Sequence, residues 1–172
     1  MTSPIALDES TAYHEAGHAL MAHAVGLRVM KVTIVACSNA LGRMDFRPAR
    51  WTNDLASPPT PHREAMLQRL IMMYLAGPVA QGIYTGENPT WGGDVDFDRA
   101  RELATYLTGA SNDESGALLG WLWLRTHNML ARPHWRGAVE ATAASLLAHG
   151  TLTGPAFRQL LAAGGQASHT TD

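Results

Sequence analysis

Two histidines and a glutamate lie close together near the start of the chain, in the segment His14-Glu15-Ala16-Gly17-His18. Residues four apart on a helix lie one above the other on the same face, so both imidazoles can reach a single metal ion. Glu15 is turned about 100° around the helix from His14, where it can hydrogen-bond to a metal-bound water. Zinc lowers the pKa of such a water to about 7 and polarises a carbonyl group. The segment therefore predicts a zinc site whose natural reaction is peptide hydrolysis.

Chance is the main alternative explanation for this HExxH pattern, because two histidines and a glutamate can simply form a polar helix face. In a chain with eight histidines, the pattern would arise in about one of a hundred shuffled sequences. Glycine inside a helix costs about 1 kcal/mol relative to alanine, so Gly17 indicates that another element packs closely against this helix. Both observations favour a metal site.

A catalytic zinc also needs a third protein ligand, which leaves one position for water. The metzincin pattern requires glycine and histidine at two later positions, where this chain has Met21 and Ala24. His23 follows His18 by five residues and points away from the shared face. The third ligand must therefore come from a later segment.

Acidic residues supply the remaining candidates for the third ligand, namely Glu64, Asp94, Asp96 and Asp98. The three aspartates stand at the predicted start of a helix, where capping and the helix dipole also favour aspartate. Spacing alone leaves the ligand role open between Asp94 and Asp96.

Composition excludes several other classes of protein. With 172 residues, of which 46% are hydrophobic, the chain suits a single domain over residues 1–172, with a disordered tail from about residue 164. A formal charge of -2 and a pI near 6.4 disfavour nucleic acid as a partner. The lone Cys37 excludes disulfide frameworks and paired-cysteine zinc sites, and it favours a cytoplasmic location. We expect neither a secretion signal nor a membrane segment.

Hydrophobic spacing predicts a mainly α fold, a compact helical zinc-peptidase domain with one small β-hairpin after the HExxH helix. Lys31–Ala36 and Leu41–Arg47 form the hairpin, with Ser38-Asn39 at its turn. The proline-rich segment Pro48–Pro61 should be a loop that borders the active site. The predicted helices span Asp8–Val25, His62–Tyr84, Asp94–Leu107, Glu114–Leu130, Pro133–His149 and Gly154–Ala163.

Capping and breaker residues set the limits of the first two helices. Asp8, Ser10 or Thr11 can cap the start of the first helix, and Gly26 can end it. Gly77-Pro78 should kink or split the second helix.

Several segments resemble the peptidase domain of the FtsH family, the membrane-anchored ATP-dependent zinc proteases. In chain order they are Ala12–Leu20 around the histidines, Lys31–Ile34 and Ala40–Gly42 in the hairpin, Leu75–Gly86 in the second helix, and Ala144–Leu161 near the C-terminus. Their order and spacing agree along almost the whole sequence. The resemblance implies a zinc-dependent endopeptidase, a metalloprotease of the FtsH-like type.

The resemblance also implies a third ligand and a mode of substrate binding. The family's third zinc ligand is an aspartate four residues before an alanine, the relation in which Asp96 stands to Ala100, and Asp94 then becomes a helix cap. The implied Zn²⁺ ligands are His14, His18 and Asp96, with Glu15 as general base. An extended polypeptide substrate would pair with an exposed edge of the hairpin through main-chain hydrogen bonds.

Three departures from the family pattern bear on activity and assembly. Gln81 and Gly82 stand where the family has acidic residues near the site, and such neighbours orient ligands and tune the metal. The segment Gly116–Arg132 matches poorly on a surface that the family uses for hexamer assembly. An ATPase module and membrane helices are absent from these 172 residues. We therefore expect short or unfolded substrates, with a separate ATPase or a homo-oligomer as partner.

Two alternatives to a general endopeptidase stay open. One is a weakly active or inactive module that keeps the metal and uses the hairpin edge to bind a peptide or a partner. The other is a dedicated regulatory protease with a single partner substrate. The intact His14, Glu15 and His18 favour an active enzyme, whereas Gln81 and Gly82 favour a binding module.

Overall fold

The structure, a computed structural model of the 172-residue chain, describes residues 4–36, 42–47, 59–87 and 95–167. Within these residues it is mainly helical, with six helices and a small antiparallel sheet of three strands, which confirms the predicted fold class. The elements in chain order are α1 (Pro4–Ala24), β1 (Arg28–Thr33), β2 (Arg43–Arg47), α2 (Pro61–Thr85), α3 (Val95–Leu107), α4 (Asn112–Leu130), α5 (Pro133–His149), β3 (Thr151–Thr153) and α6 (Gly154–Ala167).

Helix α1 begins earlier than its polar residues suggest. It starts at Pro4, so Asp8, Ser10 and Thr11 lie inside the helix, and the prediction that one of them caps its start is wrong. The predicted end is correct, because Gly26 adopts a φ of 82° directly after the helix. The backbone N–H of Gly26 donates to the carbonyl of His23, a left-handed glycine ending that satisfies a terminal carbonyl.

Helix α2 is a single element despite the glycine-proline pair in its middle. The hydroxyl of Thr60 accepts a hydrogen bond from the backbone N–H of Arg63, and Pro61 occupies the first turn, where its missing N–H costs nothing. Gly86, with a φ of 74°, ends the helix. Pro78 lies inside it, so the helix is not split. Gly77 is required for a different reason, which is its closeness to the side chains of His14 and His18.

Helices α1 and α2 pack closely against one another at Gly17. A Cβ atom at Gly17 would lie 2.6 Å from the Cβ of Ala80 and would overlap the carbonyl oxygen of Ala76. The expectation that another element packs against Gly17 is therefore confirmed. Any larger side chain would separate the two helices that carry the histidines and their partners.

The sheet joins the hairpin to the C-terminal part of the chain. Strand β1 pairs antiparallel with β2 on one side and with β3 on the other, so β2 lies at an edge. The hairpin prediction is confirmed, although β1 starts and ends three residues earlier than expected. Its predicted turn lies outside the described residues, as do residues 48–58 of the predicted loop. The third strand, in which Leu152 lies opposite Val32, was not predicted.

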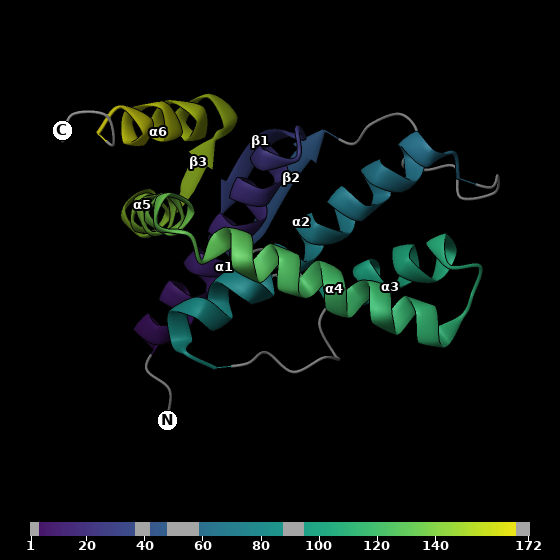
Figure 1. The fold of residues 1–172 in the computed structure, drawn as a ribbon. Helices are drawn as coiled ribbons and strands as arrows, with labels where there is room; N and C mark the ends of the chain where they lie inside the picture. The colour runs from purple at the N-terminus through teal and green to yellow at the C-terminus, as the bar shows by residue number, and fades with distance from the viewer. Residues whose placement is uncertain (1–3, 37–41, 48–58, 88–94, 168–172) are drawn as a thin grey trace.

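Figure 1 shows α1 in the middle of the molecule, with α4 crossing in front of it and α5, β3 and α6 together at one side. The core contains fully buried side chains from distant parts of the chain, including Leu20 of α1, Leu75 of α2, Leu146 of α5 and Phe157 of α6. Helix α6 continues to Ala167, past the position at which the tail was expected to begin. Residues 168–172 lie outside the described part of the chain.

Candidate metal centre

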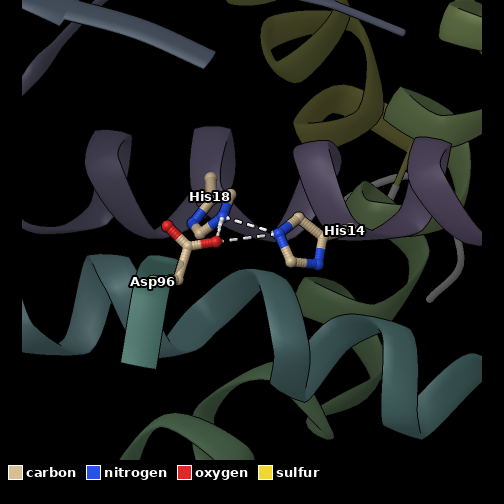
Figure 2. A group of neighbouring side chains, drawn as sticks. All are labelled: His14, His18 and Asp96. Carbon is tan, nitrogen blue, oxygen red and sulfur yellow. Dashed lines mark hydrogen bonds and ion pairs between the residues drawn. The ribbon is translucent and has the colours of Figure 1, made fainter. Parts of the chain in front are cut away.

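Three polar side chains from two distant segments converge at one point beside α2 (Figure 2). His14 and His18 come from the middle of α1, and Asp96 is the second residue of α3. The Oδ2 atom of Asp96 lies 3.0 Å from the Nε2 atom of each histidine, and the two Nε2 atoms are 3.0 Å apart. The three atoms thus form a nearly equilateral triangle.

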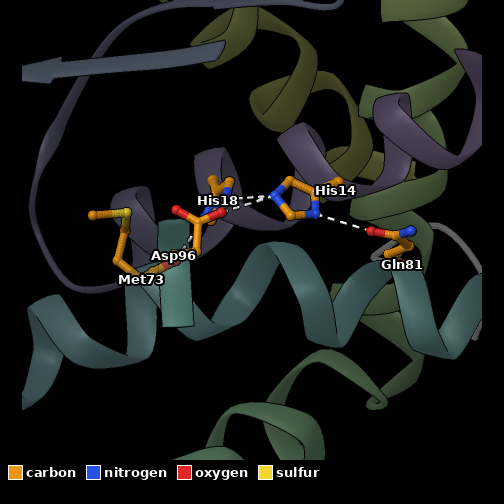
Figure 3. Close-up of polar contacts among 5 residues, drawn as sticks. All are labelled: His14, His18, Met73, Gln81 and Asp96. Atoms are coloured by element: carbon orange, nitrogen blue, oxygen red, sulfur yellow. Dashed lines mark hydrogen bonds and ion pairs between the residues drawn. The ribbon is translucent and has the colours of Figure 1, made fainter. Parts of the chain in front are cut away.

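Helix α2 orients both imidazoles through hydrogen bonds to their Nδ1 atoms (Figure 3). The Nδ1 atom of His18 donates to the main-chain carbonyl of Met73 at 2.8 Å, and the Nδ1 atom of His14 lies 3.0 Å from the side-chain oxygen of Gln81. Met73 and Gln81 are eight residues apart, about two helical turns, so they lie on the same face of α2. Each acceptor fixes one ring and the position of its proton.

The hydrogen bonds at Nδ1 determine what the other ring nitrogens can do. A neutral imidazole that donates from Nδ1 has only a lone pair at Nε2. The lone pairs of His14 and His18 therefore point at one another and at the carboxylate of Asp96, across distances of 3.0 Å. Such an arrangement is repulsive unless a positive charge lies among the three atoms. A metal ion meets this requirement.

The size of the triangle fits zinc. Zinc binds imidazole nitrogen and carboxylate oxygen at about 2.0–2.1 Å, so a tetrahedral site holds its ligand atoms about 3.3 Å apart. The separations of 3.0 Å are only a few tenths of an ångström shorter. Two nitrogen ligands and one carboxylate leave a fourth position for water or substrate, which is the composition of a catalytic zinc site.

Gly77 explains how α2 can lie so close to the Nε2 atoms of both histidines. It stands midway between Met73 and Gln81, one turn from each. A Cβ atom at Gly77 would lie 2.7 Å from the Nε2 atom of His14 and closer still to that of His18. Glycine is therefore required by space at this position. The sequence analysis missed this role and assigned Gly77 only to a kink.

Glu15 lies next to the triangle without being part of it. Its side chain is buried, with 6% of its surface exposed, and its Oε2 atom has no hydrogen-bond partner within the described residues. The other carboxylate oxygen faces Gly42, where a Cβ atom would approach it to 2.7 Å. Burial raises the pKa of Glu15 above its ordinary value, and the nearby His18 and His14 oppose this rise.

The charges of the site are strongly coupled in the absence of a metal ion. Burial alone would lower the pKa of His18, but the adjacent carboxylate of Asp96 outweighs burial and raises it to about 9. For Asp96, burial would raise the pKa, but the two histidines outweigh it and hold the pKa well below its usual range. The centre of the triangle thus favours positive charge, whether a proton or a metal ion supplies it.

The structure brings together His14, His18 and Asp96, and this group has the spacing and the atom types of a metal site. Asp94, which spacing alone could not separate from Asp96, lies outside the described residues. Glu64, at the first turn of α2, is not part of the converging group. Gln81 was expected only as a departure from a family pattern, whereas here it contacts His14 directly.

Comparison with known proteins agrees with this geometry. The model of peptidase family M41 matches residues 6–111 of the chain, a segment that contains both histidines, Glu15 and Asp96. This chain belongs to peptidase family M41. The resemblance to FtsH peptidase domains is thereby confirmed, and the converging histidines and aspartate lie within the matched part of an M41 metalloprotease domain.

A curated relative makes the same connection. The ATP-dependent zinc metalloprotease FtsH of Opitutus terrae is 41% identical to this M41 domain over 99 residues, which are 56% of this chain. The match covers 15% of the length of that protein. None of the helices in the described ranges combines the length and the apolar character needed to span a membrane.

Proposed function

We propose that this M41 domain is a zinc-dependent endopeptidase that hydrolyses peptide bonds in unfolded or flexible polypeptides. The observation that carries the proposal is the convergence of three lone-pair-bearing atoms, 3.0 Å apart, beside a buried carboxylate oxygen of Glu15 that has no partner in the described part of the chain. The proposed ligands and the proposed general base are therefore neighbours.

His14, His18 and Asp96 would hold the zinc ion in this proposal. When bound, zinc supplies an acidic water and a positive charge that stabilises the oxyanion formed from the peptide carbonyl. The protein contributes rigidity. The carbonyl of Met73 and the amide of Gln81 keep both rings in the tautomer that presents Nε2, so the ligands need no rearrangement to bind.

Glu15 has the properties of a general base. A carboxylate whose pKa is raised by burial binds a proton more strongly than an exposed one, which suits an exchange of protons near neutral pH. The Oε2 atom would accept a proton from the attacking water and later deliver it to the leaving amine. The side chains of His14 and Asp96 expose 17% and 22% of their surface, so the site is open to substrate on their side.

Strand β2 provides a place for the substrate backbone. It is an edge strand in the sheet order β2-β1-β3, and Gly42, directly before it, contacts the side chain of Glu15. A polypeptide that adds to this edge as a further strand would pass the catalytic residues. Only an extended segment can pair in this way, which is why flexible chains are the proposed substrates.

Gln81 supports the enzyme over a binding module. Its contact with His14 supplies the acceptor that an acidic residue would otherwise provide, so this departure does not weaken the site. A cytoplasmic location, a separate ATPase that delivers substrate and a homo-oligomeric state remain predictions.

Hydrolysis of fluorescently labelled casein by the purified, zinc-loaded protein tests the proposal. We expect cleavage that stops when a chelator removes the metal and returns when zinc is added back. A stably folded protein of similar size, offered in parallel, should stay intact until it is unfolded. A protein with one zinc per chain that cleaves neither substrate would contradict the proposal and favour the binding module.

A further inference from the structure

Strands β1 and β2 carry a charge opposite in sign to that of the chain as a whole. Four of their eleven residues are basic and exposed, namely Arg28, Lys31, Arg43 and Arg47. Asp45 is the one acidic residue in either strand. The two strands therefore have a net charge of +3, whereas the 172-residue chain has a formal charge of -2. The positive charge is concentrated on the hairpin.

The strand pattern places the charges of β2 on the outer face of the sheet. Arg43, Asp45 and Arg47 alternate with Met44 and Phe46 along the strand, and successive side chains of a strand point to opposite faces. Met44 and Phe46 pack against the hydrophobic core. The three charged side chains therefore share the face that is turned away from the core, beside the edge of the sheet that β2 forms.

Positive charges at one end of this face are not compensated. Arg28 lies directly opposite Arg47, and like charges in such a cross-strand pair are destabilising. Neither arginine has an acidic partner within the described residues. At the other end, the Nε atom of Arg43 donates to the Oδ1 atom of Asp45 at 2.5 Å, and Lys31 lies opposite the same aspartate. An anionic group would therefore bind at the end where Arg28 and Arg47 meet.

We propose that Arg28 and Arg47 select acidic segments of polypeptide substrates as these segments add to the edge of β2. The inference rests on the proposed function, since it names the class of polypeptide that the edge strand accepts. In a strand added beside β2, the residue opposite Arg47 has its Cβ atom about 4.5–5.5 Å from that of the arginine. A glutamate or aspartate at this position neutralises the repulsion between the two arginines.

The selecting contact lies at a distance from the catalytic residues. Gly42, which contacts the side chain of Glu15, precedes Arg47 by five residues, or about 17 Å of extended chain. The acidic residue of the substrate therefore lies several residues from the bond that is cut. A polypeptide fits this surface better than a nucleic acid does, because only a polypeptide can extend the sheet through main-chain hydrogen bonds.

Peptide binding by the Glu15→Gln protein tests the inference without any need for cleavage. Fluorescence anisotropy would compare three labelled peptides of equal length, in which threonine alternates with glutamate, with glutamine or with lysine. We expect the glutamate peptide to bind about tenfold more tightly than the glutamine peptide, and the lysine peptide to bind most weakly. The preference should shrink as added salt screens the charges.

Charge reversals in the same Glu15→Gln protein supply the matched variants. Arg28→Glu and Arg47→Glu together should make the lysine peptide the tighter ligand. Arg125→Glu and Arg132→Glu together, at exposed positions in α4 and directly after it, change the total charge equally and should keep the glutamate preference. Arg47→Glu alone places opposite charges across the hairpin, so thermal unfolding should show a fold at least as stable as before.

Four results would overturn the inference. They are no measurable binding of the glutamate peptide, equal affinity for all three peptides, an equal loss of preference in the Arg125 and Arg132 double variant, and tighter binding of a single-stranded oligonucleotide than of the glutamate peptide. Equal peptide affinities together with intact casein cleavage by the unchanged chain would remove this inference and leave the peptidase standing. A glutamate preference in a chain that cleaves nothing would support the acidic selection and contradict the peptidase.

Discussion

The Nδ1 atom of His14 on α1 lies 3.0 Å from the side-chain oxygen of Gln81 on α2, so an amide fixes the ring that would bind the metal. One turn further along α1, His18 is fixed in the same way by the carbonyl of Met73, which lies two turns from Gln81 on α2. The two histidines are spaced by four residues, and their two partners by eight, with Gly77 between them. The packing of α1 on α2 thus organises the site before any metal binds.

Replacement of Gln81 tests whether this hydrogen bond matters. Gln81→Leu keeps a similar volume but removes the acceptor, so His14 loses the group that fixes its tautomer. We expect zinc affinity to fall by about 10- to 100-fold, the usual effect of removing such a partner. Gln81→Glu keeps an oxygen that can accept the hydrogen bond from His14, so this variant should bind zinc at least as well as the unchanged chain. Competition with a chromophoric chelator measures both, and equal affinities for Leu and Gln would contradict the prediction.

A methyl group at Gly77 should disrupt the metal centre through space alone. In Gly77→Ala, the new Cβ atom meets the Nε2 atoms of both histidines, so the rings must move or the helices must separate. Zinc affinity should fall by at least about tenfold. Gly137→Ala, in α5, is the matched control because a Cβ there meets nothing within 4 Å; it should bind zinc normally and stabilise the fold by about 1 kcal/mol. Zinc titration and thermal unfolding of both variants decide the matter.

The third ligand can be tested with two aspartates from the same helical turn. Asp96 lies 3.0 Å from both histidines, whereas Asp98 is exposed and pairs with Arg101. Asp96→Ala should leave a site of two histidines and reduce bound zinc well below one per chain. Asp98→Ala should keep full zinc content, since an exposed ion pair contributes at most about 1 kcal/mol. Metal analysis after dialysis would contradict the assignment if Asp96→Ala retained its zinc, and Asp94 would then be the next residue to change.

Local spacing was sufficient to predict the part of the site that lies on one helix. A separation of four residues places His14 and His18 together whatever the rest of the chain does, and close packing at Gly17 followed from the cost of glycine in a helix. The third ligand is different in kind. Asp96 reaches the histidines only because α3 packs on α2, and two nearby aspartates offered equally good spacing, so the choice required a family resemblance.

Contacts between distant elements were the part that sequence could not supply. Strand β3 has three residues, and nothing in their pattern shows that Leu152 lies opposite Val32. The role of Gln81 depends on which face of α2 meets α1, which no single-helix pattern reveals. The caps of α1 failed for a simpler reason: polar residues that favour a helix start also occur inside helices when tertiary structure extends the helix.

Cleavage of labelled casein by Glu15→Gln, compared with the unchanged chain at equal zinc content, tests the central claim most directly. The amide preserves the size of the side chain and touches none of the three atoms that would hold the metal, but it cannot accept a proton. The account predicts one bound zinc per chain and a rate lower by about 100-fold or more, the scale of general base catalysis. A zinc-loaded Glu15→Gln protein that cleaves casein at the unchanged rate would contradict it.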